Sequence, residues 1–194
     1  MNKSLRSLLI GSGFLLAASA AQAHTGAGST HGFFYGAGHP FGGLDHLLAM
    51  VAVGLWAAQL GGRALWAVPL TFVGIMAIGG VLGMTGISLP FVEIGILASV
   101  LALGVFVAAA VRLPLTWSMA LVGFLALFHG HAHGAEMPVD SSGVAYAAGF
   151  ILATAALHTS GIAIGVLFKN LSTPILTQAA GACVALLGVW LVVS

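Results

Sequence analysis

Apolar runs of about twenty residues follow one another along most of this 194-residue chain, and short polar or proline-bearing breaks separate them. A helix needs ~20 apolar residues to cross the ~30 Å hydrocarbon core of a bilayer. Hydrophobic residues make up 60% of the chain and charged residues 5%, whereas a globular domain carries about 25% charged residues. The pattern predicts an all-α membrane protein and excludes a water-soluble domain.

The few charged residues narrow the range of functions. Five Lys/Arg and four Asp/Glu provide no basic surface for nucleic acid and no acidic tail. The single cysteine, Cys183, excludes a disulfide framework and a cysteine-rich metal site. Histidine is abundant by contrast, with eight residues in a chain that has few other titratable groups.

The N-terminus has the three regions of a secretory signal peptide. Lys3 and Arg6 precede the apolar run 8–18, and Ala21-Gln22-Ala23 supplies small residues for cleavage. Residues 1–23 are therefore expected to be removed, with an uncleaved signal anchor as the alternative. Residues 24–38 then form a periplasmic leader rich in His and Gly.

The rest of the chain, residues 39–194, is predicted to be a bundle of six transmembrane helices after the cleavable signal peptide. Its loops are very short, so this chain has no room for an ATPase domain. The predicted spans are 39–60, 65–84, 89–111, 115–134, 144–168 and 175–193.

The basic residues of the mature chain predict its orientation. If the mature N-terminus faces the periplasm, Arg63, Arg112 and Lys169 all fall in cytoplasmic loops, and the outer loops 85–88 and 137–142 have no Lys or Arg. This asymmetry follows the positive-inside rule. We therefore expect a multi-pass protein of the bacterial inner membrane with both termini in the periplasm.

Small residues spaced four apart predict close contacts between helices, as membrane helices require. The pairs are Gly79/Gly83 and Gly161/Gly165.

The first predicted span is unusual, because its uninterrupted apolar run, 47–60, is too short to cross a bilayer. Pro40 suits a first helical turn. A helix from there aligns His39, Gly43, His46 and Met50 on one stripe, with Asp45 beside it. Ionisable groups at membrane depth are costly unless they are paired or bind an ion, so they are functional candidates.

The end of the fourth span carries a second group of polar residues. His129, His133 and Glu136 follow at i, i+4 and i+7 on one helix face, and two imidazoles one turn apart can chelate a divalent ion. His131 points away and is expected to be a loop residue. Asp45, His46, Glu93 and His129 all lie at a similar depth below the outer face, so we expect one site, with His158 deeper as a second station.

Structural alternatives remain open for several candidates. His158 can serve as a hydrogen-bonding residue between helices, Glu93 can reach the interface, and Met50 is either a core residue or a soft ligand. His24 and His31 belong to a flexible tract or capture metal together with His39.

These motifs together resemble the HupE/UreJ family of bacterial membrane proteins, which is associated with nickel supply for hydrogenase and urease. The resemblance covers essentially the whole mature chain. It rests on His39-Pro40-x-x-Gly43-x-Asp45-His46 with Met50 and Gly54, on Glu93 with Ser99 and Gly104, on Phe128-His129-Gly130-x-Ala132-His133-Gly134-x-Glu136-x-Pro138, and on Gly149-Phe150 before Leu157-His158. It implies a secondary nickel permease, and no enzyme.

The expected function is therefore import of a divalent transition metal as cargo, with no permanent cofactor. Imidazole and carboxylate ligands suit Ni²⁺, Co²⁺, Zn²⁺ or Cu²⁺ alike, so the preference for nickel comes from the resemblance. Because histidine must be deprotonated to bind metal, uptake is expected to weaken in acid. The alternatives are an intramembrane zinc-dependent hydrolase and a metal-binding accessory protein that transports nothing, and a homo-oligomer stays open.

Overall fold

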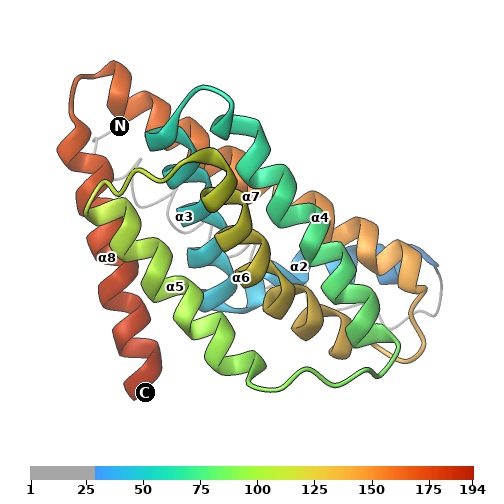
Figure 1. The fold of residues 1–194 in the computed structure, drawn as a ribbon. Coiled ribbons are helices and arrows are strands. Elements are labelled where there is room, and N and C mark those ends of the chain that lie inside the picture. The colour runs from blue at the N-terminus through green and yellow to red at the C-terminus, as the bar shows by residue number, and fades with distance from the viewer. Residues whose placement is uncertain (1–28) are drawn as a thin grey trace, which may run out of the picture.

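Helices form all the regular secondary structure in residues 29–194, the part of the chain that the computed structural model describes. The predicted signal peptide and His24 lie outside these residues. Within them the all-α prediction is confirmed, since there are seven helices and no strand. The helices are α2 (Ser29–Gly42), α3 (Leu44–Leu60), α4 (Ala64–Met84), α5 (Val92–Ala108), α6 (Leu115–Ala135), α7 (Gly143–Asn170) and α8 (Pro174–Val193) (Figure 1).

Four of these helices, α4, α6, α7 and α8, are long and apolar enough to cross a membrane. A fifth span results if the bent pair of α2 and α3 is counted as one. The apolar helix α5 has 17 residues, which at ~1.5 Å per residue falls short of the ~30 Å hydrocarbon core. The structure therefore supports a multi-pass membrane protein and does not confirm a count of six spans.

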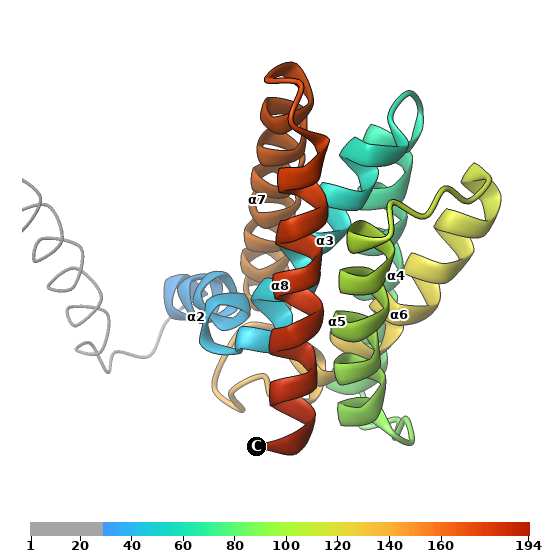
Figure 2. The same cartoon turned by 90° about the vertical axis from the view of Figure 1, so that its left-hand side faces the viewer.

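The first predicted span is not one continuous helix. The helix is interrupted between Gly42 and Leu44, and the two resulting helices, α2 and α3, meet at an angle of 83°. Gly43 at the break has extended dihedrals, φ −110° and ψ 123°. Figure 2 shows α2 lying across the long axis of the other helices. Moreover, α2 begins at Ser29, so much of the segment expected to be a leader is helical.

Glycines allow the helix pairs to approach closely. α4 packs chiefly against α6, α5 against α8, and both α2 and α3 against α7. In the first pair, Gly79 and Gly83 of α4 lie against backbone carbonyls of α6, while Gly130 and Gly134 of α6 lie against carbonyls of α4. A Cβ atom at any of the four would collide with backbone, so these glycines form a reciprocal contact, which we call the α4/α6 glycine seam.

A second close contact joins α7 to α3. Gly161 lies against the carbonyl of Val51, and a Cβ at Gly165 would lie 2.6 Å from Cβ of Ala58. The prediction that the two glycine pairs mediate helix contacts is confirmed.

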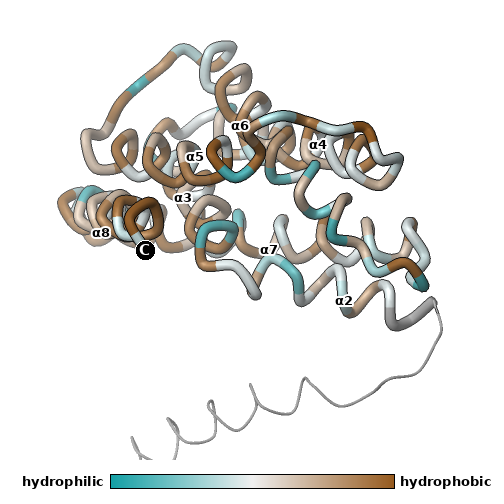
Figure 3. Tube along the Cα trace, turned by 90° about the horizontal axis from the view of Figure 1, so that it is seen from below, coloured by the Kyte–Doolittle hydropathy of each residue, from teal (hydrophilic) through white to brown (hydrophobic). Residues whose placement is uncertain are grey.

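The two ends of the bundle differ in charge. The connections α3–α4, α5–α6 and α7–α8 lie at one end (Figure 2). The first two of these connections carry Arg63 and Arg112, and Lys169 lies in the last turn of α7 at the same end. The four carboxylates of the chain belong to the opposite end, where α3 and α5 begin and α6 ends. Between the ends, α5 and α8 expose large apolar side chains, and Figure 3 colours most of both helices as hydrophobic. We call the two ends the basic end and the acidic end.

Candidate metal centre

The start of α3 fixes the orientation of His46. Oδ1 of Asp45 accepts a hydrogen bond from the backbone N–H of His46 at 2.8 Å and lies 3.0 Å from Nδ1 of the same residue. An imidazole that donates from Nδ1 to a carboxylate keeps the lone pair on Nε2. That Nε2 atom is buried and has no hydrogen-bond partner. Asp45 thus holds His46 in the tautomer that can bind a metal ion, an arrangement common around metal ligands.

Ser99 of α5 orients His129 of α6, as Asp45 orients His46. Its hydroxyl donates to the carbonyl of Ile96 at 2.6 Å, and Oγ also lies 2.7 Å from Nε2 of His129. A hydroxyl has one proton to donate, so it must accept from Nε2–H of His129. The lone pair of His129 is therefore on Nδ1, which is buried without a partner.

Four imidazoles from three helices meet at the acidic end of the bundle. The ring centre of His46 lies 4.9 Å from that of His129 and 4.6 Å from that of His133, and His39 of α2 lies 4.7 Å from His133. We call these four residues the histidine cluster. His129 and His133 are fully buried, as their i, i+4 spacing on α6 and the glycine seam on its other face require.

His39 and Glu136 form the exposed edge of the histidine cluster. Nε2 of His39 lies 3.0 Å from Oε2 of Glu136, and the Glu136 side chain is 57% exposed. The contact joins α2 to the C-terminal end of α6. Glu136 therefore does not share a ligand position with His129 and His133, and instead holds the outermost imidazole from the solvent side.

Aromatic side chains surround the buried part of the cluster. Phe150 stacks on His133 with ring centres 5.3 Å apart, and Tyr146 lies 6.0 Å from His39. Phe72 lies between His129 and His158, at 5.7 and 5.1 Å. His158 is thus separated from the cluster by an aromatic ring, consistent with the predicted deeper position.

The cluster is not a preformed cage. Within residues 29–194, no three His, Cys, Asp or Glu side chains surround one point at metal-ligand distances. Several buried imidazole nitrogens nevertheless lack a hydrogen-bond partner, which is costly in an apolar interior. They are His46 Nε2, His129 Nδ1, His131 Nδ1, and both ring nitrogens of His133 and of His158.

Some predicted site residues lie apart from the cluster. Glu93 is exposed in the first turn of α5, with no hydrogen bond or ion pair in the described part of the chain. Met50 is buried in the core. His31 lies within α2, but its side chain is not described. Of the layer expected to contain four groups, the structure brings together Asp45, His46 and His129.

The expectation for His131 is wrong. His131 is buried on α6, and Nε2 lies 2.7 Å from the carbonyl of Ile87 in the α4–α5 connection. The helix continues through it to Ala135 because the adjacent glycines let α6 pack along α4. His131 therefore contacts the loop and has no part in the cluster.

The sequence assigns no role to two residues of the site, although Ser99 is among the motif residues that carry the family resemblance. Phe72 sits in an unbroken apolar run, where nothing distinguishes it from a lipid-facing residue. Ser99 is one small polar residue on a helix, and its role depends on a contact to α6 thirty positions later. Only the fold shows the part each plays.

The apolar helices of the described residues define the general class, a multi-pass membrane protein, here with buried imidazoles at one end of the bundle. The HupE / UreJ protein family matches residues 12–191, and the chain belongs to this family. It is also similar to "Protein HupE" of Rhizobium leguminosarum bv. viciae, with 49% identity over 175 residues, covering 90% of this chain and 91% of that protein. No solved structure matches the chain.

Proposed function

We propose that the protein is a permease that imports a divalent transition metal across the inner membrane, with nickel as its cargo and Co²⁺ or Zn²⁺ as competitors. The metal would serve the maturation of a hydrogenase or urease. The observation that carries the proposal is the histidine cluster, in which buried imidazole nitrogens of His46, His129 and His133 have no partner within the protein.

The tautomers of two imidazoles support metal binding in particular. Asp45 and Ser99 take the N–H of His46 and His129, so both rings present a lone pair in the buried interior. A lone pair that accepts no hydrogen bond there is unfavourable unless a cation occupies the site. In this proposal Asp45 and Ser99 orient the ligands, and His46, His129 and His133 bind the ion.

The route of the ion follows from exposure. His39 and Glu136 are the accessible members and receive the ion first, the buried imidazoles replace part of its water, and His158 lies beyond Phe72. Because no closed cage exists among the described residues, the ion exchanges between partial sites, which permits release. A dication entering an inside-negative cell gains about 4.6 kcal/mol per 100 mV, so ATP is not required for accumulation.

The test is uptake of nickel, and separately of cobalt and zinc, into proteoliposomes with an imposed inside-negative potential. Asp45→Asn and His46→Ala are expected to abolish uptake. Asp140→Asn is the matched control for the first change, because this exposed carboxylate lies in the α6–α7 connection away from the cluster, and it should retain full uptake.

Two results would replace the proposal. Metal binding without flux, in folded and correctly oriented protein, would indicate an accessory protein that transports nothing. Stoichiometric zinc that resists exchange, together with hydrolytic activity lost on chelation, would indicate an intramembrane hydrolase.

A further inference from the structure

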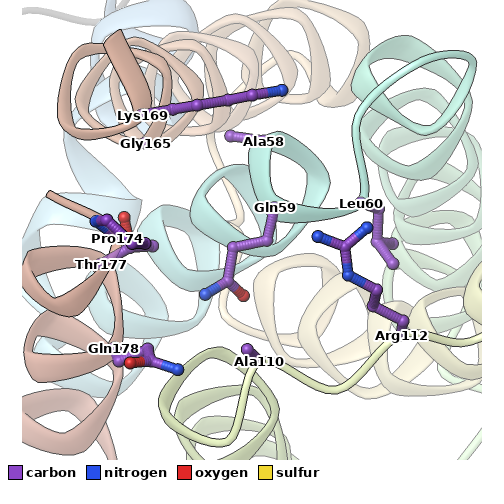
Figure 4. A pocket seen from close by; sticks show the side chains of 10 residues that line it. All are labelled: Ala58, Gln59, Leu60, Ala110, Arg112, Gly165, Lys169, Pro174, Thr177 and Gln178. Carbon is purple, nitrogen blue, oxygen red and sulfur yellow. The ribbon is translucent and has the colours of Figure 1, made fainter. Parts of the chain in front are cut away.

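A cavity of about 210 Å³ lies at the basic end of the bundle, on the far side from the histidine cluster. Figure 4 shows the side chains that line it, which come from α3, α7, α8 and the α5–α6 connection. Its polar lining comprises Gln59, Arg112, Lys169, Thr177 and Gln178. At ~30 Å³ per liquid water the cavity has room for about seven waters, enough for a small hydrated anion.

Two like charges meet in this cavity without a counterion. Arg112 and Lys169 are 57 positions apart in sequence, yet both line it, and Arg63 lines an adjoining cavity together with Arg112. Within residues 29–194, no carboxylate lies within ion-pair distance of these three cations. Both side chains are exposed, so water screens their mutual repulsion, and an anion held between them would be attracted by both charges.

The positive-inside rule explains why basic residues lie at this end of the bundle. It does not explain why Arg112 and Lys169 line the same cavity. That rule requires only that Lys and Arg lie in the loops on one side. Helix dipoles do not explain the convergence either, because α3, α5 and α7 end here while α4, α6 and α8 begin here, and the opposed dipoles largely cancel.

The donors in the cavity suit a phosphate group. Gln59 donates Nε2 to the carbonyl of Val107 at 2.9 Å and so helps to hold α3 against the end of α5. Arg112 offers a planar set of N–H donors that matches phosphate oxygens, and Lys169 offers a compact point charge. Thr177 and Gln178 add neutral donors from the N-terminal part of α8.

We propose that the cavity lined by Arg112 and Lys169 binds a phosphate-bearing anion, supplied either by an anionic lipid headgroup or by free phosphate. This site is independent of metal transport through the histidine cluster.

The test uses the purified full-length protein, stripped of lipid in neutral detergent. Native mass spectrometry with added phosphatidylglycerol, and with phosphatidylcholine as the neutral comparison, reports the lipid source. Isothermal titration with inorganic phosphate reports the free anion. Arg112→Gln and Lys169→Gln should each weaken binding about tenfold or more, since each removes a charge-assisted hydrogen bond.

Arg63→Gln is the matched control, because it removes one positive charge from the same end but does not line this cavity. It should leave binding within about twofold of the wild type. Arg112→Lys keeps the charge needed for membrane insertion and should still weaken binding, because the planar fork is lost. Tight binding of phosphatidylglycerol alone would identify the lipid source, and phosphate that binds and displaces the lipid would identify the free anion.

The proposal is overturned if neither phosphatidylglycerol nor phosphate binds in preference to the neutral lipid. It is equally overturned if Arg63→Gln weakens binding as much as Arg112→Gln does, because that result indicates a diffuse surface charge and no defined site.

Discussion

His133 is fully buried against Phe150, yet neither of its ring nitrogens has a hydrogen-bond partner. His131, two positions earlier on the same helix, is also buried but uses Nε2 to bind the carbonyl of Ile87. His131 thus pairs one ring nitrogen with the fold and leaves Nδ1 without a partner, whereas both ring nitrogens of His133 lack one. In the proposed function His133 binds the metal ion and His131 does not.

This contrast makes a prediction about stability. His133→Phe should unfold at the same temperature as the wild type or higher when metal is absent, because it removes an unsatisfied buried group worth about 1–3 kcal/mol. It should also lack the rise in unfolding temperature that nickel is expected to give the wild type under the proposed function. Thermal unfolding in detergent, with and without Ni²⁺, measures both.

His131→Phe should show the reverse behaviour. It should lower the unfolding temperature by leaving the Ile87 carbonyl without a donor, and it should retain the response to nickel. A His133→Phe protein that unfolds earlier and still responds to nickel would contradict the assignment of His133 as a ligand.

The contact between Ser99 and His129 leads to a second prediction about single residues. Ser99→Ala should lower nickel affinity about 10–100-fold, because the hydroxyl that fixes the tautomer of His129 is lost. Ser99→Thr should restore much of the affinity, since it keeps the hydroxyl. Equilibrium binding of nickel to purified protein measures the change. Ser118→Ala is the matched control, because Ser118 is equally buried but contacts only backbone carbonyls of its own turn.

The spacing in the sequence is enough to predict which candidate residues lie together where they are neighbours or one helical turn apart. His129 and His133 are one turn apart on one helix, and Asp45 and His46 are neighbours, so local geometry suffices to join them. The helical spacing predicts Glu136 on the same face as His129 and His133. In the structure Glu136 lies against His39 instead, because α6 ends at Ala135 and α2 crosses its end. The contribution of Ser99 depends on contacts between distant helices, which periodicity does not encode.

At the scale of elements, the α4/α6 glycine seam positions the histidine cluster. Gly130 and Gly134 alternate with His129 and His133 along α6, so the glycines meet α4 while the imidazoles face α2 and α3. The motif His129-Gly130-x-x-His133-Gly134 thus combines a helix contact with a ligand pair. A side chain at either glycine would push the imidazoles away from their partners.

The α4/α6 glycine seam can be tested by making the same substitution, glycine to alanine, at one position inside the seam and at one position outside it. Gly130→Ala should destabilise the protein by about 1–3 kcal/mol through collision with the Met76 backbone. Gly74→Ala lies on the open face of α4, where nothing is within 4 Å of an added Cβ, and should be neutral or stabilise by up to about 1 kcal/mol. Unfolding in detergent compares the two, and equal stability of both variants would contradict the seam.

The sequence does not predict the bend between α2 and α3. Because the apolar run 47–60 is short, the sequence predicts a helix that starts near Pro40. In the structure Pro40 lies inside α2, and the chain turns after Gly42. Glycine pairs permit a turn without specifying its angle, and only the contacts of α2 with α7 decide the direction.

For the whole molecule, the separation of charge between the two ends determines how it sits in the membrane. Arg63, Arg112 and Lys169 gather at the basic end, and the carboxylates and the histidine cluster lie at the acidic end. The positive-inside rule predicts that the basic end faces the cytoplasm. In that orientation the exposed edge of the histidine cluster, His39 and Glu136, would face the periplasm, as the proposed import of a metal ion requires.

Cysteine labelling tests this orientation. In a Cys183→Ala background, which removes the one native thiol, Val139→Cys lies in the exposed α6–α7 connection and Asn170→Cys lies at the end of α7. A maleimide that cannot cross the inner membrane should label Val139→Cys in intact spheroplasts and Asn170→Cys only after lysis. Neither substitution changes the charges of the loops, so neither disturbs the signal that sets orientation. Labelling in the opposite order would place the histidine cluster in the cytoplasm, and the direction of transport would then have to be export or the cluster an exit site.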